Sequence, residues 1–93
     1  MPGHAYYDSR LSPERRAEVR TVAEQALAAI PGTTVSEHVS VIRGYLVLLD
    51  GSPNKAEFLD NVRKSLSVLA NLAEAQGRAE LTHRLDSLIR SLQ

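Results

Sequence analysis

Apolar residues recur along most of the chain at intervals of three and four, the spacing that places side chains on one face of an α-helix. Turn-forming residues, which include Pro31-Gly32, Asp50-Gly51 and Gly77, interrupt this pattern at three points. The four segments that result span about residues 13–30, 35–50, 54–76 and 78–92. No segment shows the strict alternation of a half-buried strand. The pattern therefore predicts an all-α protein.

The first and last segments each carry a single apolar stripe. The stripe of the first consists of Val19, Val22, Ala23, Ala26, Leu27 and Ile30. That of the last consists of Leu81, Leu85, Leu88 and Leu92. A single stripe is typical of a helix that packs on one side only, so these two helices are expected at the periphery.

The two middle segments carry more apolar residues than one stripe can hold. Beside its main stripe, the second segment has Val41, Tyr45 and Leu48, and the third has Phe58, Val68 and Leu72. Three explanations are open. These helices are central and contacted from several sides, or they bury a second face against another chain, or the residues are scattered on a monomer's surface.

Two local features bear on how the helices begin and connect. Thr34 with Glu37 three residues later matches a capping box, which predicts a helix start near Thr34. The leucine stripe after Gly77 is out of phase with the one before it, which favours a turn at Gly77 over one continuous helix.

Gly44 lies in the middle of the second segment, where glycine costs about 1 kcal/mol relative to alanine. A closely packed neighbouring backbone would explain it. The alternative is that the helix tolerates the cost.

Together these observations predict a compact, antiparallel bundle of three or four helices over residues 12–93, preceded by an N-terminal arm at residues 1–11. The side chains expected to be most central are Val22, Leu27, Leu46, Leu49, Val62, Leu66, Leu69 and Leu85.

Composition narrows the class of protein. The 93 residues suit one domain, and with 43% hydrophobic but only 4% aromatic residues the core must be aliphatic. Eleven Lys and Arg balance eleven Asp and Glu, so no nucleic-acid or membrane partner is expected. The chain has no cysteine, no long apolar span and no apolar N-terminal signal segment, which predicts a cytoplasmic protein.

Residues with catalytic or metal-binding potential are sparse. His4, His38 and His83 form no H-x-x-x-H pair, and nucleophile-elbow and phosphate-loop motifs are absent. We therefore expect no metal, no cofactor and no enzymatic activity. One motif offers an alternative, because "RAELTH" (Arg78 to His83) resembles the R-x4-H motif of HEPN ribonucleases. That resemblance implies that Arg78 and His83 act on an RNA phosphodiester, although Ala79 stands where the family commonly has a polar residue.

The stretch "SVIRGYLVLLDGSPNKAEFLDNVRKSLSVLANLAEA" resembles the dimerisation hairpin of sensor histidine kinases, over about residues 33–75. In that family a helix reading I-x-G-Y-x-x-L-L is followed by a turn and a leucine-rich helix. The phosphorylated histidine is missing, because Thr33 occupies its position nine residues before Ile42. The resemblance implies a degenerate hairpin that dimerises or blocks a partner without phosphotransfer.

The sequence thus predicts a small protein-interaction or regulatory module that acts through apolar helix faces as a homodimer. Tyr45 is the expected anchor, because a rigid aromatic with one polar tip is typical of interfaces. The predicted partner-binding residues are Val41, Tyr45, Leu48, Val68 and Leu72. An inhibitor or immunity-type protein that blocks a specific target with the same face is the other non-catalytic possibility.

Overall fold

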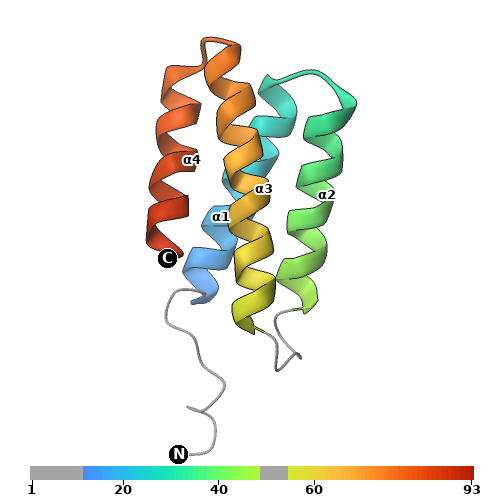
Figure 1. Ribbon diagram of the computed structural model, residues 1–93, viewed down its shortest axis with the longest axis vertical. Coiled ribbons are helices and arrows are strands. Elements are labelled where there is room, and N and C mark those ends of the chain that lie inside the picture. The colour runs from blue at the N-terminus through green and yellow to red at the C-terminus, as the bar shows by residue number, and fades with distance from the viewer. Residues whose placement is uncertain (1–11, 49–54) are drawn as a thin grey trace, which may run out of the picture.

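The computed structural model describes residues 12–48 and 55–93. These residues form four α-helices and no strand: α1 (Pro13–Ala29), α2 (Thr33–Leu48), α3 (Lys55–Ala75) and α4 (Ala79–Ser91). Successive helices run in opposite directions (Figure 1). The all-α prediction is confirmed, and the bundle has four helices. The predicted N-terminal arm (residues 1–11) and Leu49 lie outside the described residues.

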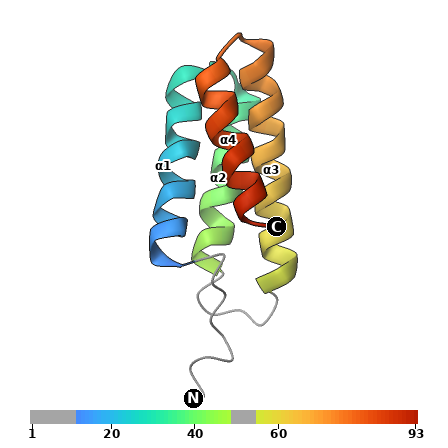
Figure 2. The same ribbon diagram turned by 90° about the vertical axis from the view of Figure 1, so that its left-hand side faces the viewer.

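The helices are arranged as a ring in which each packs against its neighbours in the chain. The ring closes where α4 returns to α1, and Figure 2 shows α4 between α1 and α3. The α2–α3 and α3–α4 seams are extensive, whereas α1 and α4 touch over a smaller area. Short connections between antiparallel neighbours produce this up-down-up-down order.

Backbone N–H groups at both ends of α1 find hydrogen-bond acceptors within the helix or at its cap. The Arg15 backbone N–H donates to Ser12 Oγ at 3.1 Å, and Pro13 occupies the first turn, where its missing N–H costs nothing. At the other end, the Ile30 N–H donates to the Ala26 carbonyl at 2.9 Å.

Helix α2 begins at Thr33, two residues before the predicted start. Gly32, with φ of +128°, turns the chain immediately before the helix. Thr34 consequently lies inside the first turn and makes no capping bond with Glu37. The predicted capping box is therefore wrong.

Helices α3 and α4 are separated by a tight turn. Gly77 has φ of +71°, its N–H donates to the Glu74 carbonyl at 3.0 Å, and the Arg78 N–H donates to the Ala73 carbonyl at 2.9 Å. This pair of bonds is the Schellman motif, which uses glycine in the left-handed conformation to end a helix. The expected turn at Gly77 is confirmed, and the continuous rod is wrong.

The core is aliphatic throughout and draws on all four helices. Of the predicted central residues, Val22, Leu46, Val62, Leu66, Leu69 and Leu85 are buried. Leu27 is only half-buried, because Ala23 and Ala26 take the inward positions of α1 and leave it at the margin. Ser65 is the one buried polar side chain in the described part of the chain, and its hydroxyl is hydrogen-bonded to His38 Nδ1 at 3.3 Å.

Candidate functional site

The large apolar side chains that remain exposed in residues 12–48 and 55–93 all lie on α2. They are Val41, Val47 and Leu48, with 39%, 69% and 54% of their surface exposed. Isolated exposed apolar residues are ordinary, but a cluster on one helix is typical of an interaction site. This cluster is the feature of the structure that most suggests a function.

Helical geometry explains why these residues face outward. The buried residues of α2 are Val35, Val39, Ile42 and Leu46. Gly44 is two residues from both Ile42 and Leu46, and two residues turn an α-helix by about 200°, so Gly44 lies opposite the core. Its neighbours at intervals of three and four share that side. We call this surface the outer face of α2, and it consists of Glu37, Ser40, Val41, Gly44, Val47 and Leu48, all exposed.

The outer face carries little charge. Glu37 is its one formally charged member. Arg43, at the edge toward α1, is ion-paired with Glu24 of that helix, so this edge has no net charge. A surface that combines apolar side chains with so few charges is easily desolvated by a partner.

Gly44 exposes the helix backbone at the centre of this face. A Cβ built at Gly44 would meet no atom within 4 Å, and the residue lies in a regular helix rather than at a positive φ. The close neighbour that the sequence analysis suggested is therefore not another helix of the same chain, as far as the described residues extend. Nothing in residues 12–48 and 55–93 accounts for a glycine at this position.

The five predicted partner-binding residues separate into two groups. Val41 and Leu48 are exposed on α2, whereas Tyr45, Val68 and Leu72 are half-buried. The Tyr45 ring packs against Phe58 of α3, with centroids 5.2 Å apart, and Leu72 packs against the core. Some of the additional apolar residues of α2 and α3 therefore pack between these two helices, as Tyr45 and Phe58 do.

Val47 is the residue of this surface that the sequence analysis missed. It belongs to neither apolar stripe of its helix, and it is nevertheless the most exposed of the three large apolar residues. Its spacing of three from Gly44 is the signal that could have placed it on the outer face.

Two shallow hollows lie along the less closely packed seam between α1 and α4. One, of about 380 Å³, is lined by Gln25, Ala29, Arg78, Ala79, Glu80, Leu81 and Arg84. The other, of about 390 Å³, is lined by Glu18, Thr21, Val22, Gln25, His83, Arg84 and Ser87. Gln25 and Arg84 line both hollows, and the Arg84 guanidinium donates to Gln25 at 2.9 Å and to Glu80 at 3.0 Å.

The two residues of the ribonuclease-like motif line different hollows in the described part of the chain. Arg78 lines the first of these hollows and His83 the second. His83 also lines a third, of about 350 Å³, with Glu74 and Asp86. Within the described ranges no three His, Asp or Glu side chains are grouped so that they could hold a metal ion.

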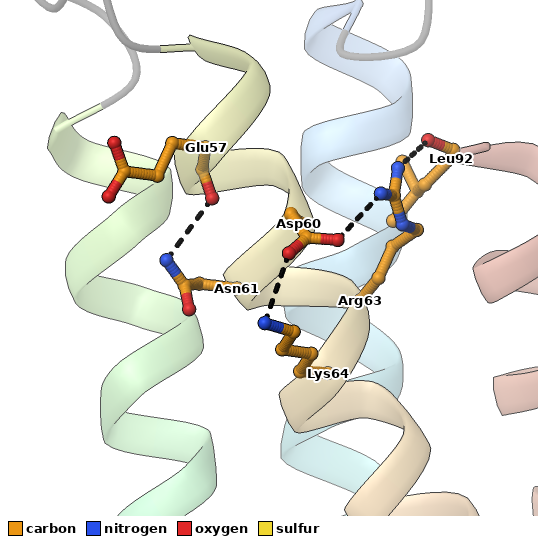
Figure 3. Close-up of polar contacts among 6 residues, drawn as sticks. All are labelled: Glu57, Asp60, Asn61, Arg63, Lys64 and Leu92. Atoms are coloured by element: carbon orange, nitrogen blue, oxygen red, sulfur yellow. Dashed lines mark hydrogen bonds and ion pairs between the residues drawn. The ribbon is translucent and has the colours of Figure 1, made fainter.

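Asp60, Arg63 and Lys64 of α3 form a cluster of ion pairs (Figure 3). Hydrogen bonds from Lys64 and Arg63 hold the pKa of Asp60 below its ordinary value of 3.8. Arg63 donates to Asp60 at 2.9 Å and to the Leu92 carbonyl at 2.9 Å, so it links α3 to the end of α4. The Asp60 carboxylate is thus paired with two cations of its own helix.

Comparisons with known proteins add no function to this geometry. The chain matches no protein-family model, no curated protein and no solved structure. Helices α2 and α3 form an antiparallel hairpin, but any bundle with short connections contains such pairs. The resemblance to the histidine-kinase hairpin therefore stays a prediction. Among the helices described, none has the length and apolar content needed to cross a bilayer.

Proposed function

We propose that this protein is a small, non-catalytic interaction module of the cytoplasm, which regulates or assembles with a protein partner through the outer face of α2. One observation carries the proposal: the exposed large apolar side chains of the described structure are gathered on one helix face, around an accessible glycine. Both a dimer of this chain and an inhibitor that blocks a target would use such a face.

The physical basis is the burial of apolar surface. Each large aliphatic side chain contributes about 1.5–3 kcal/mol when it passes from full exposure to full burial. Val41, Val47 and Leu48 keep a substantial fraction of their surface for a partner to cover. Tyr45, the anchor expected from sequence, contributes less, since its ring already packs against Phe58.

The experiment compares matched baits in an extract of the source organism. The full chain, a V47D/L48D double variant and an S87D control are immobilised, and the retained proteins are quantified by mass spectrometry. Ser87 is exposed on α4, away from α2, so its variant adds charge without touching the outer face. We expect the wild type and S87D to retain the same protein in near-stoichiometric amount, whether a second copy of the chain or another protein, and V47D/L48D to lose it. Equal retention by all three baits would overturn the proposal.

A second measurement addresses the catalytic alternative. Single-stranded RNA is incubated with the wild type and with His83→Ala, and cleavage is followed on gels. The proposal predicts no cleavage by either protein. Cleavage by the wild type that His83→Ala abolishes would instead favour the ribonuclease hypothesis.

A further inference from the structure

We propose that α1 is a releasable cover, which opens away from the bundle as one unit about Gly32 while α2, α3 and α4 stay folded together. The protein then has a second, partly open conformation in which residues of the apolar core are exposed. The inference does not involve the outer face of α2, so it stands or fails independently of the proposed function.

The side chains that α1 buries are small. The buried residues of this helix are Val19, Val22, Ala23 and Ala26. None is larger than valine, whereas α3 buries Leu59, Leu66 and Leu69 together with one valine and two alanines. Hydrophobic stabilisation grows with the apolar area removed from water. Helix α1 is therefore held in place by less apolar burial than α3.

Each contact that α1 makes with another helix is less extensive than the α2–α3 and α3–α4 seams. The two hollows lined by both Gln25 and Arg84 lie along its seam with α4, and its contact with α3 is smaller still. Low contact density is typical of segments that open at a lower free energy than the rest of a protein. By this criterion α1 is the helix most easily released.

The polar links from α1 to its neighbours include two that lie at the surface. Arg43 of α2 is ion-paired with Glu24, and Arg84 of α4 donates to Gln25 at 2.9 Å. Both links are exposed, so water competes for the same groups, and exposed pairs of this kind contribute little to stability. They therefore orient α1 without holding it firmly.

The other three helices hold one another without α1. The α2–α3 and α3–α4 seams are the two most extensive in the described structure, and α3 belongs to both. The Gly77 turn and the bond from Arg63 to the Leu92 carbonyl join α3 and α4 at opposite ends of α4. The departure of α1 leaves both large seams and both of these links in place.

Gly32 provides the hinge. Within residues 12–48 and 55–93, one covalent connection joins α1 to the other helices, through Pro31 and Gly32. Gly32 has φ of +128°, and a Cβ built there would meet no atom within 4 Å. Glycine reaches a wide range of backbone angles, so this connection can rotate. Once it is detached, an isolated helix of this length is marginal in water, and its amides exchange with solvent.

The first test is native-state hydrogen exchange of the full chain, followed by NMR in urea concentrations below the unfolding transition. Rates are compared with those of an unstructured chain. We expect the slowest amides of α1 to exchange at least about tenfold faster than those of α3. Their rates should also depend less on urea, because opening α1 exposes less surface than global unfolding. Equal protection and equal urea dependence in the two helices would show one cooperative unit and overturn the proposal.

A matched pair of variants tests the order of opening. Thr21 of α1 and Asn71 of α3 are both exposed and have similar helix propensities, so alanine at either site stabilises its own helix by a similar amount. Thr21→Ala should slow exchange about threefold in both helices, because α1 is lost in the open and in the unfolded state. Asn71→Ala should slow exchange about threefold in α3 alone, because α3 stays folded while α1 opens. If Asn71→Ala slowed α1 as much as α3, the two helices would open together and the proposal would be wrong.

Discussion

Two leucines lie in opposite surroundings: Leu66 of α3 is fully buried, and Leu48 of α2 has 54% of its surface exposed. We expect Leu66→Ala to lower the free energy of unfolding by about 2–5 kcal/mol, because it removes transfer energy and leaves a cavity. Leu48→Ala, the matched control, should change it by less than about 0.5 kcal/mol. Urea unfolding at a low micromolar concentration measures both. Equal losses for the two variants would contradict the burial of these residues.

Gly77 and Gly44 form a second matched pair. Gly77 has φ of +71°, where a side chain is strained, so Gly77→Ala should cost about 1–2 kcal/mol. Gly44 lies in a regular helix with open space around it, so the same change there should stabilise the monomer by up to about 1 kcal/mol. Chemical unfolding of both variants gives the comparison. A gain in stability on Gly77→Ala would be inconsistent with the Schellman turn.

At the scale of elements, α3 and α4 are joined by the Gly77 turn at one end and by Arg63 at the other. Arg63 donates to Asp60 and to the Leu92 carbonyl through different nitrogens of its guanidinium. Lysine lacks this planar fork, so Arg63→Lys should cost about 1 kcal/mol and speed amide exchange in the last turn of α4. Arg90→Lys, at an exposed site in that turn, is the control. Unchanged exchange in Arg63→Lys would show that the link does not hold the helix end.

Because the pKa of Asp60 is lowered in the folded protein, the stability that this cluster contributes depends on pH. Because the folded pKa lies below the ordinary value of 3.8, the charged carboxylate stabilises the fold above pH 3.8. That contribution is lost as the pH falls from 3.8 through the folded pKa. We expect the stability difference between the wild type and Asp60→Asn to shrink over this range.

The same pKa can be measured directly. In a carboxyl titration by NMR, Asp60 should titrate below 3.8 in the wild type and closer to 3.8 in Lys64→Ala, because the hydrogen bond from Lys64 is the largest cause of the shift. An Asp60 pKa at or above 3.8 in the wild type would show that the hydrogen bonds do not form in solution.

For the whole molecule, the order of the helices predicts fast folding. Each helix packs against its neighbour in the chain, and the contacts of α1 with α3 and α4, which close longer loops, are less extensive. Bundles rich in local contacts fold in microseconds to milliseconds. The chain has no tryptophan, so far-UV circular dichroism after a temperature jump is the suitable probe. A dominant refolding phase of seconds would show that distant contacts limit the rate.

The sequence by itself determined where the helices lie in the chain and how many apolar stripes each one carries. The bounds of α1 and α4, and the end of α3, differ from those expected by one residue or less, and α2 begins two residues early. Local rules suffice for this, because a period of 3.6 residues, a serine cap and a glycine after a helix act within a few residues of the chain. The same local reasoning identified six of the central side chains.

Only the tertiary structure decided which apolar side chains remain exposed on the surface. Sequence spacing grouped Tyr45, Val68 and Leu72 with Val41 and Leu48, yet the first three are half-buried, and the Tyr45 ring packs against Phe58 of α3. Spacing also did not identify Val47 as a surface residue, and it predicted Leu27 to be central although that side chain is only half-buried. The physical reason is that burial depends on which neighbouring helix covers a given face, and that is settled by contacts between residues far apart in the chain.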